Sequence, residues 1–378
     1  MSTALHQEEF DLIIVGASFA GLTCARSAAL RGLRVLVLES KTDPGARVHT
    51  TGILVKEAAD EIDIPAELTR PVHGVRLYSP SLKHIDLFSP GYYFLTTATA
   101  LLLRWLAKEA ERAGVQIRCD TRFRGATRHR DAFTIDGLDL KARYLVGADG
   151  ARSKVSECFS LGRNRAFLTG VEAEFQTTNN VDNRYLHCFL DSQLAPGYLA
   201  WIAPAPGVIQ VGLASNNRNK PDLERFRRKI QPLFQFDDND IVERRSGVIP
   251  CSGIVKPFAA PSVLLIGDAA GMVSPLTAGG IQLAFRHGRR AGQLIADHLM
   301  RLGPCPELIM EQELPSFWKK SILRKILDTG PPNKVLDMML NTNVMRQLAQ
   351  KTYFHRRGIA HQSFEDYCTK FEQTEQLS

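Results

Sequence analysis

The sequence predicts an α/β fold with a parallel sheet, an inserted antiparallel sheet and a C-terminal helical segment. Two apolar, β-branched runs, residues 11–15 and 262–266, have the composition of buried parallel strands. Between them, residues 166–249 consist of short strand-like segments separated by turns rich in Pro and Gly, which is typical of an antiparallel sheet. From residue 307 onward the pattern is helical and basic. The second domain is therefore expected to interrupt the first.

The first elements form a complete βαβ unit. A strand at residues 11–15 precedes a helix at 20–31, which ends at Gly32 as helices commonly do, and a second strand occupies 35–38. The later elements follow from apolar periodicity and turn residues. They are a hairpin at 74–88, a helix at 101–113, strands at 115–117, 144–146, 170–176, 185–190, 198–202 and 208–213, a helix at 222–234 and a helix at 279–300.

The composition is that of a large globular protein. The chain has 378 residues, of which 44% are hydrophobic and 23% charged, which suits two domains and argues against disorder. The net charge of +7 suits either a basic surface or an anionic partner. Because the sequence contains no nucleic-acid recognition module, nucleic acid is not expected as a partner.

The cysteines and the ends of the chain bear on metal binding and on the compartment. The seven cysteines are scattered, without CxxC pairs, and no HExxH signature is present, so neither a disulfide framework nor a metal site is expected. Residues 1–10 do not resemble a signal peptide, and no apolar run reaches the roughly 18–20 residues of a membrane span. We therefore expect a cytoplasmic protein, at most peripheral to a membrane.

The turn after the first strand has the pattern of a pyrophosphate-binding loop. It reads Gly16-Ala17-Ser18-Phe19-Ala20-Gly21. Gly16 permits the tight turn, Gly21 permits close packing of helix and strand, and Ser18 replaces the usual middle glycine with a small residue that can itself bond a phosphate. Glu39 ends the second strand, where a carboxylate can accept hydrogen bonds from a ribose. The turn, the helix and Glu39 together predict a dinucleotide site.

Two further motifs follow later strands of the parallel sheet. Residues 147–155 read GADGARSKV, and residues 267–275 read GDAAGMVSP. Asp268 can accept hydrogen bonds from ligand hydroxyls or can cap a helix. Asp149 can contact a cofactor or can be a turn aspartate. Gly279 and Gly280 then begin a helix whose amides and dipole favour an anionic group.

These two motifs resemble the DG and GD motifs of flavoprotein hydroxylases and reductases. Over about residues 10–300 the chain resembles the FAD-dependent superfamily that contains p-hydroxybenzoate hydroxylase, and within it the geranylgeranyl reductase family. Residues 267–290 and 44–52 carry this similarity, together with residues 197–212, in which Trp201 and Pro204 match the family's Tyr-x-Trp-x-Phe-Pro segment. The resemblance implies a Rossmann-like FAD-binding domain of the GR2 type and an inserted substrate domain.

Several positions depart from the pattern of that family. Leu199 and Ala203 stand where the family has Tyr and Phe, and Thr50 stands where the reductases usually carry a Cys. Residues 96–99 contain no basic side chain, whereas the family usually has an Arg there that contacts FAD. We therefore expect Arg47 or Lys41 to supply that charge.

The resemblance implies FAD as the cofactor and NAD(P)H or another reductant, including an electron-donor protein, as the source of electrons. The turn motif and the resemblance together predict cofactor contacts from the glycine turns, the acidic residues at strand ends and the loop before the long helix. These residues are Gly16, Ser18, Phe19, Ala20, Gly21, Glu39, Lys41, Arg47, Phe123, Asp149, Gly150, Gly267, Asp268, Pro275, Ala278, Gly279, Gly280 and Ile281.

The function implied by the resemblance is that of an FAD-dependent reductase or dehydrogenase, with hydride transfer through flavin N5 to a small apolar, isoprenoid- or polyketide-like substrate. A flavin-dependent monooxygenase is the alternative, followed by a flavin halogenase and a non-catalytic electron carrier. Catalytic residues are not identified. The candidates are Trp201, which either walls a cavity or belongs to the sheet core, Thr50, and His49, although a lone histidine is more often structural. The substrate is expected between the inserted sheet and the flavin.

The predicted domain boundaries follow these motifs. The FAD-binding domain comprises residues 8–75, 96–165 and 253–302, the substrate domain comprises the hairpin 76–95 and residues 166–252, and the C-terminal helical region comprises 303–378. Residues 317–357 mix apolar and basic side chains. Such helices either contact an anionic membrane peripherally or pack on the domain with their lysines outward, and the second interpretation is favoured.

Overall fold

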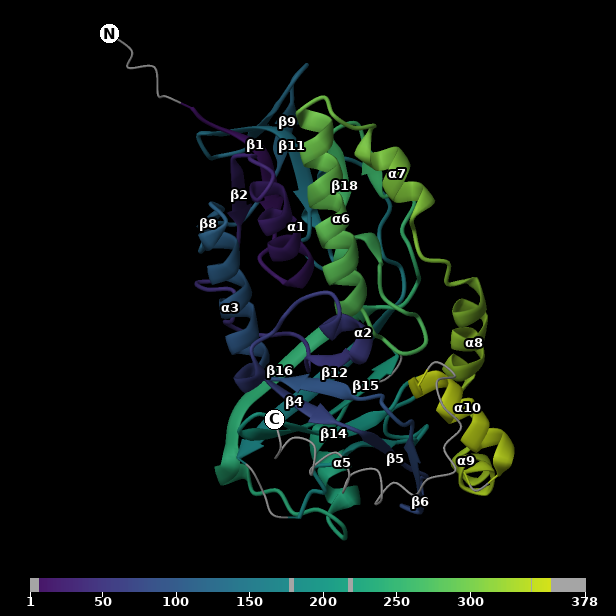
Figure 1. Cartoon of the computed structure of the whole chain (residues 1–378). Coiled ribbons are helices and arrows are strands. Elements are labelled where there is room, and N and C mark those ends of the chain that lie inside the picture. The colour runs from purple at the N-terminus through teal and green to yellow at the C-terminus, as the bar shows by residue number, and fades with distance from the viewer. Residues whose placement is uncertain (1–6, 177–179, 217–219, 341, 355–378) are drawn as a thin grey trace. The chain divides into compact units, whose positions relative to one another are not determined.

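The computed structural model describes residues 7–176, 180–216, 220–340 and 342–354 (Figure 1). By their contacts, the described residues divide into two compact units. Unit 1 comprises 1–48, 99–167 and 248–323, and unit 2 comprises 49–98, 168–247 and 324–378. The chain therefore leaves unit 1 and returns to it twice, as expected for a parallel-sheet domain that a second domain interrupts.

In the described residues, unit 1 contains an eight-stranded sheet with the order β17-β18-β11-β1-β2-β8, to which β10 and β9 are attached at β11. The strands from β18 to β8 run parallel along this order. The central strand β1 has a fully buried run at Leu12, Ile13 and Ile14, as expected for a strand covered on both faces. The strands are β1 (Glu8–Val15), β2 (Val35–Leu38), β8 (Gln116–Arg118), β9 (Ala126–Arg128), β10 (Phe133–Ile135), β11 (Leu140–Gly147), β17 (Ala259–Ala260) and β18 (Val263–Leu265).

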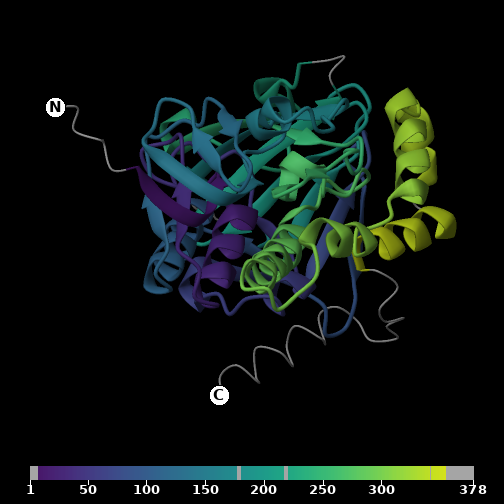
Figure 2. The same cartoon turned by 90° about the horizontal axis from the view of Figure 1, so that it is seen from above.

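Two helices of unit 1 lie side by side, α1 (Phe19–Ala29) and α6 (Ile281–Leu299) (Figures 1 and 2). Their backbones approach closely at two glycines of α6. A Cβ on Gly288 would lie 2.6 Å from the carbonyl oxygen of Ala20, and one on Gly292 would lie 2.4 Å from that of Cys24. The other helices of this unit are α3 (Thr99–Arg112), α4 (Lys154–Cys158), the 3-10 helix Gly267–Ala270 and α7 (Pro306–Gln312).

The described residues of unit 2 form a seven-stranded sheet with the order β16-β12-β15-β14-β13-β5-β6. Its pairs are antiparallel from β12 to β13 and between β5 and β6, whereas β13 and β5 are parallel. One face packs on α5 (Leu223–Ile230), with Phe175 and Val211 against Phe226. The strands are β5 (Gly74–Tyr78), β6 (His84–Phe88), β12 (Phe167–Gln176), β13 (Tyr185–Phe189), β14 (Ala200–Ala205), β15 (Val208–Asn216) and β16 (Ile241–Pro250).

A small sheet with the order β3-β7-β4 completes the β structure of unit 2. Its strands are β3 (Ile53–Val55), β4 (Thr69–Val72) and β7 (Phe94–Thr97), and they were not predicted. Because β3 and β4 both pair with β7, residues 49–75 group with unit 2, whereas the sequence had assigned them to the nucleotide-binding domain. The short helices α2 (Lys56–Ala59), Ala66–Leu68 and Asp238–Asp240 also lie in unit 2.

The chain after α6 is helical, as predicted. Its helices after α7 are α8 (Trp318–Thr329), α9 (Asn333–Met339) and α10 (Asn343–Phe354). The rest of the predicted helical region, residues 355–378, and the first six residues of the chain lie outside the described residues. In the described ranges, none of the helices has both the length and the apolar composition that a membrane span requires.

Candidate functional site

The turn between β1 and α1 closes so tightly that two of its positions admit only glycine. Gly16 has a φ of 107°, and a Cβ there would lie 2.3 Å from the carbonyl oxygen of Ala148, which follows β11. A Cβ on Gly21 would lie 2.0 Å from the carbonyl oxygen of Gly16. The start of α1 is thereby held against the ends of β1 and β11, where its amides can receive an anion.

The first turn of α1 is suited to a phosphate. Ser18 is the N-cap residue, but within the described residues its side chain makes no capping hydrogen bond, and the residue is exposed. No acidic residue lies in the first turn, so the positive end of the helix dipole is not neutralised. Phe19 and Ala20 are buried, and the Phe19 ring packs edge-on against Phe285 of α6 with the centroids 5.5 Å apart.

Glu39 lies at the carboxyl end of β2, and its side chain is buried. Its Oε2 accepts a hydrogen bond from the backbone N–H of Ala17 at 2.8 Å, and its Oε1 accepts one from the backbone N–H of Lys41 at 2.9 Å. Oε1 also accepts from the Ser40 hydroxyl at 3.3 Å, so the carboxylate is fixed beside the glycine turn, and Oε2 keeps a lone pair for a ribose hydroxyl. This geometry fits the role predicted for Glu39.

The segment after β2 carries the basic residues predicted to contact the cofactor. The Lys41 ammonium donates to the carbonyl oxygen of Pro44 at 3.1 Å, and burial lowers the pKa of Lys41. Arg47 is exposed and has a φ of 44°. The sequence analysis overlooked Arg104 of α3, whose Nε donates to Oδ1 of Asp43 at 2.9 Å, so α3 does bring a cation to this segment. Phe123 is buried in the same unit.

Asp268 lies in the 3-10 helix that follows β18, and its side chain does not cap that helix. Among the described residues its carboxylate has no hydrogen-bond donor, and burial raises its pKa to about 6. A Cβ on Gly280, the N-cap of α6, would lie 3.6 Å from Oδ1 of Asp268. An acid without a protein donor beside a helix N-terminus fits a ligand that brings hydroxyl groups.

The loop before α6 folds back on itself and fixes the start of that helix. The backbone N–H of Ser274 donates to the carbonyl oxygen of Gly279, and that of Ala278 donates to the carbonyl oxygen of Ser274, both at 3.0 Å. Ala278 takes a φ of 52° to close the turn. The loop and the first residue of α6 contain five predicted cofactor contacts, Pro275, Ala278, Gly279, Gly280 and Ile281.

Asp149, by contrast, uses its carboxylate within its own turn. Oδ1 accepts from the Ser153 hydroxyl at 2.6 Å, and Oδ2 accepts from the backbone N–H groups of Lys154 at 2.6 Å and Val155 at 3.0 Å. These bonds satisfy amides at the start of α4, which supports the turn-aspartate role that the sequence left open. Contact of Asp149 and of Gly150, which has a φ of 82°, with a cofactor stays a prediction.

Unit 2 contains a buried polar cluster centred on Glu172 of β12. The Trp201 indole Nε1 on β14 donates to Oε2 of Glu172 at 2.9 Å, and Thr51 also hydrogen-bonds this side chain. The indole reaches β12 by crossing β15 over Gly212, where a Cβ would lie 2.6 Å from Cζ2 of the indole. Gly212 pairs with both Glu172 and Trp201 in the sheet, so the three positions lie in one row.

Charged groups next to Glu172 extend the cluster to β16. Arg245, which is buried, lies 3.6 Å from Oε1 of Glu172 and 2.7 Å from Oε1 of Glu174, and it also pairs with Glu243 at 2.7 Å. The Gln210 amide donates to Oε1 of Glu174 at 3.0 Å. Burial is the main cause that raises the pKa of Glu172 to about 7, against hydrogen bonds and the Arg245 charge that lower it. A proton can therefore reside on Glu172 near neutral pH.

The loop with the weak catalytic candidates lies against this cluster. Nδ1 of His49 donates to the carbonyl oxygen of Ser246 on β16 at 2.9 Å, and Thr51 contacts Glu172. Thr50, between them, is exposed. The structure therefore brings the His49–Thr51 loop and Trp201 to one cluster through Glu172, a residue that the sequence did not single out.

The sequence did contain a signal for the cluster. Glu172 and Glu174 alternate with apolar residues in a strand, and such a pattern was compatible with an ordinary solvent-facing side. The structure shows instead that both faces of β12 are buried, one against α5 and the other in the polar cluster with Arg245. The cluster can be recognised only when Arg245 of β16, which is distant in the sequence, is known to pair with Glu172 and Glu174.

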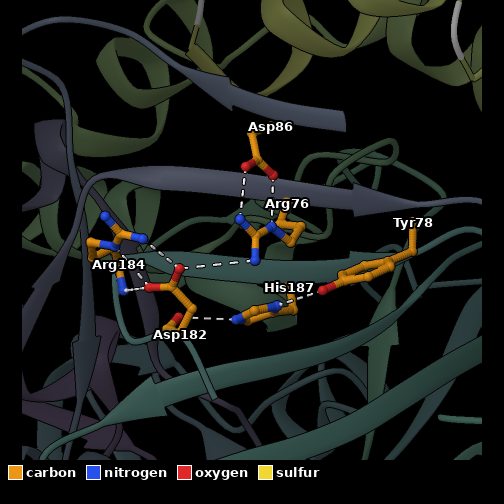
Figure 3. A network of polar contacts seen from close by, with 6 residues as sticks. All are labelled: Arg76, Tyr78, Asp86, Asp182, Arg184 and His187. Carbon is orange, nitrogen blue, oxygen red and sulfur yellow. Dashed lines mark hydrogen bonds and ion pairs between the residues drawn. The ribbon is translucent and has the colours of Figure 1, made fainter. Parts of the chain in front are cut away.

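A second polar network in unit 2 connects β5, β6 and β13 (Figure 3). Arg76 binds Asp86 through two bonds of 2.7 Å, and Asp182 pairs with Arg184. Nε2 of His187 donates to the carbonyl oxygen of Asp182 at 3.0 Å, so its Nδ1, 3.1 Å from the Tyr78 hydroxyl, accepts from it. Burial lowers the pKa of His187 to about 4 and raises that of Tyr78 to about 12. The histidine is therefore neutral, and the network holds strands together.

The glycine turn, Glu39 and Asp268, which has no donor among the described residues, define unit 1 as a dinucleotide-binding unit. Residues 9–303 match the family described as the FAD binding domain, and the chain belongs to this family. FAD is therefore its cofactor. The three features of unit 1 fit that cofactor: a turn open to the pyrophosphate, an acid for a ribose and an acid for the ribityl hydroxyls.

Two relatives of the chain are named as reductases of digeranylgeranylglycerophospholipids. Digeranylgeranylglycerophospholipid reductase 2 of Methanosphaera stadtmanae is 29% identical over 310 residues, 76% of this chain and 78% of the relative. The digeranylgeranylglycerophospholipid reductase of Methanocaldococcus jannaschii is 25% identical over 343 residues, 87% of each chain. The chain is thus an FAD-dependent oxidoreductase, and these relatives favour a reductase over a monooxygenase.

Solved structures share the fold. A geranylgeranyl bacteriochlorophyll reductase-like protein from Thermoplasma acidophilum superposes with a TM-score of 0.78 at 22% identity and covers 92% of this chain and 97% of its own. The p-nitrophenol 4-monooxygenase of Pseudomonas putida superposes with a TM-score of 0.68 at 16% identity, covering 93% and 100%. At these identities the two structures establish the α/β fold with its inserted sheet, which reductases and monooxygenases have in common.

Proposed function

We propose that the chain is a reductase that saturates carbon–carbon double bonds in an apolar, isoprenoid-like lipid. The observation that carries the proposal is the match to digeranylgeranylglycerophospholipid reductases, which extends over 87% of one relative. Such a match includes segments of both units, so it is not limited to the cofactor site. The electron donor is proposed to be NAD(P)H or a reduced protein.

Saturation of a double bond places a hydride on one carbon and a proton on the other. Bound FAD in its reduced form supplies the hydride. The chain's own residues would bind and orient the cofactor: the amides around Ser18 would hold the pyrophosphate, Asp268 would accept from the ribityl hydroxyls, and the N-terminus of α6, which has no side-chain cap, would favour negative charge on the bound group.

The proton that the reaction consumes comes from water in the overall balance. Glu172, which is buried and oriented by Trp201 and Thr51, has a pKa of about 7, so its protonation changes near neutral pH within unit 2.

The test is a single-turnover reaction without oxygen. The protein is reduced, mixed anaerobically with a glycerophospholipid that carries geranylgeranyl chains, and the lipid is examined by mass spectrometry. Addition of hydrogen across double bonds, together with reoxidation of the flavin, is the expected result. A lipid that stays unsaturated under these conditions would contradict the reductase assignment.

A flavin-dependent monooxygenase is the second candidate, and one observation favours it: Leu199, Ala203 and Thr50 depart from the reductase pattern. Labelled oxygen separates the two candidates. Oxygen-18 incorporated into a product in air, with no saturation in its absence, would establish the monooxygenase.

A further inference from the structure

Helix α8 exposes three of its apolar side chains and buries a charged one. Trp318, Ile322 and Ile326 are 63%, 53% and 59% exposed. Arg324 is buried in the same helix, and Leu323 and Leu327 are half-buried. The helix therefore has a second apolar face on the side where an ordinary surface helix is polar.

The buried side of α8 is held by an ion pair. Arg324 donates through Nε and Nη2 to the carboxylate of Asp328, at 3.2 and 2.5 Å, one helical turn further along. The pair lies against Gly197, because a Cβ there would come within 2.7 Å of both Nη2 of Arg324 and Oδ1 of Asp328. This contact fixes which side of the helix faces outward.

The outward side is a narrow apolar stripe bordered by lysines. Trp318, Ile322 and Ile326 are spaced four residues apart, so they lie on one face of the helix. Lys319 and Lys325, both exposed, fall on the two borders of that stripe at 100° per residue. The Lys319 ammonium lies 5.3 Å from the centre of the Trp318 ring. Helices α9 and α10 also expose apolar residues, namely Val335, Met338, Val344 and Leu348.

We infer that the exposed face of α8, defined by Trp318, Ile322 and Ile326 with Lys319 and Lys325, docks on the surface of an anionic phospholipid bilayer. Tryptophan prefers the boundary between headgroups and acyl chains, isoleucine inserts below it, and lysines beside the stripe pair with anionic headgroups. Within the part of the chain that the structure describes, nothing covers Trp318, Ile322 and Ile326, as an interfacial helix requires of its apolar face.

A second copy of the chain fits this face less well. A two-fold contact through α8 would place the same apolar stripe and the same lysines of both copies against each other, so like charges would meet. Three apolar side chains also offer far less than the roughly 800 Å² per partner of a stable protein interface. Lipid has neither restriction, because headgroups supply the opposite charge.

The inference rests on the proposed function for its purpose, since an enzyme that acts on a membrane lipid gains access to it from the bilayer surface. Its test does not depend on activity. The FAD-loaded, full-length protein is incubated with vesicles of phosphatidylglycerol or of phosphatidylcholine, and the bound fraction is measured by sedimentation at low and high salt. The emission of Trp318 is followed as a second readout.

The decisive variant is Trp318→Ala with Ile322→Ala and Ile326→Ala, and a charge variant is Lys319→Glu with Lys325→Glu. The matched controls are Leu30→Ala with Leu302→Ala, which removes exposed apolar residues elsewhere, and Lys83→Glu with Lys108→Glu. FAD content shows that each variant is folded.

The expected result is binding to phosphatidylglycerol vesicles and little binding to phosphatidylcholine, with a blue shift of tryptophan emission. The α8 variants should bind at least about tenfold more weakly, whereas the controls bind as the wild type does. Equal binding by the α8 variants and the wild type, or no vesicle binding at all, overturns the inference. So does a concentration-dependent dimer that the α8 variant abolishes, because a second copy would then cover the face. Failure of the alkene-saturation test with intact vesicle binding would remove only the proposed reaction.

Discussion

The indole Nε1 of Trp201 reaches over Gly212 to donate to Glu172, so a side chain on β14 is bonded to one on β12 across the intervening strand β15. This hydrogen bond is possible only because the residue between them, Gly212, has no side chain. A Cβ at Gly212 would lie 2.6 Å from the indole. Trp201 and Glu172 therefore form one unit whose geometry depends on a glycine that contacts no ligand.

Gly212→Ala should displace the indole and break the bond to Glu172. We expect a loss of about 1–3 kcal/mol in the free energy of unfolding, because the methyl group must force aside a packed ring. Denaturant unfolding followed by tryptophan emission measures both effects. Gly170→Ala on the neighbouring strand is the matched control, since its Cβ would meet its first neighbour at an ordinary 3.7 Å. Equal losses from the two variants would show that the row of three residues has no special role.

Glu172→Gln keeps an oxygen that can accept the hydrogen bond from Trp201, but the side chain no longer titrates. The pKa of Glu172 is about 7 in the folded protein against 4.5 ordinarily, so its protonated form stabilises the fold at low pH and that stabilisation is lost as the pH rises through 7. Between pH 4.5 and 7 the variant should therefore gain roughly 3 kcal/mol of unfolding free energy relative to wild type. Denaturant unfolding of both proteins across this pH range measures the gain. If the variant gained no stability relative to wild type, the raised pKa of Glu172 would be contradicted.

Asp268→Asn should weaken FAD binding. Loss of a charged acceptor for the ribityl hydroxyls costs about 1–3 kcal/mol, which is roughly a fivefold to 150-fold rise in the dissociation constant. In the wild type, the affinity should also fall as the pH drops below about 6, because the free protein then protonates Asp268 and must release that proton to bind. Fluorescence titration of the apoprotein at several pH values checks both, with Asp297→Asn on α6 as the control. An affinity independent of pH in the wild type would argue against contact between Asp268 and the cofactor.

The His187 network should make unit 2 sensitive to acid. The pKa of His187 is lowered from 6.5 to about 4, so the neutral ring stabilises the fold above pH 6.5, and this contribution is lost as the pH falls toward 4. The loss amounts to roughly 3 kcal/mol, opposite in sign to the effect of Glu172 over nearly the same range. His187→Gln should remove the acid sensitivity, and His129→Gln, an exposed histidine, should leave it in place. Thermal unfolding at pH 4.5 and 7 distinguishes the two variants.

Strands β1, β2 and β18 could be predicted because each is a short, continuous apolar run with a motif at its carboxyl end, at residues 11–15, 35–38 and 262–266. Strands β9, β10 and β17 of the same unit were missed, because they have only two or three residues each. The small sheet of unit 2 could not, since β3, β4 and β7 have three or four residues each, β4 contains Pro71, and none has a recognisable period. Strand β16 was missed because the middle of its sequence, IVERRSGVIP, is polar, and its buried residues are Arg245 and Pro250.

The cofactor contacts were accessible to the sequence because they lie within short motifs, whereas the cluster around Glu172 joins residues 51, 172, 201 and 245. Nothing local reveals that Glu172 faces an arginine seventy-three positions away (245 minus 172) rather than water. Asp149 lies in a motif that suggested contact with a ligand, but its carboxylate accepts hydrogen bonds from Ser153 and Val155 of its own turn.

Because the two units alternate along the chain, the order of synthesis decides when each strand can pair with its neighbours. Strand β11 can pair with β1 as soon as it emerges, but its other neighbour β18 is made only after β12 to β16. Likewise β5 must wait for β13, more than ninety residues later, before its second edge is covered. Each unit therefore keeps an open, apolar strand edge during most of synthesis, where it can recruit a chaperone or a neighbouring nascent chain. Each unit consists of three separate stretches of the chain. Neither unit can therefore be produced alone by cutting the gene at a single place.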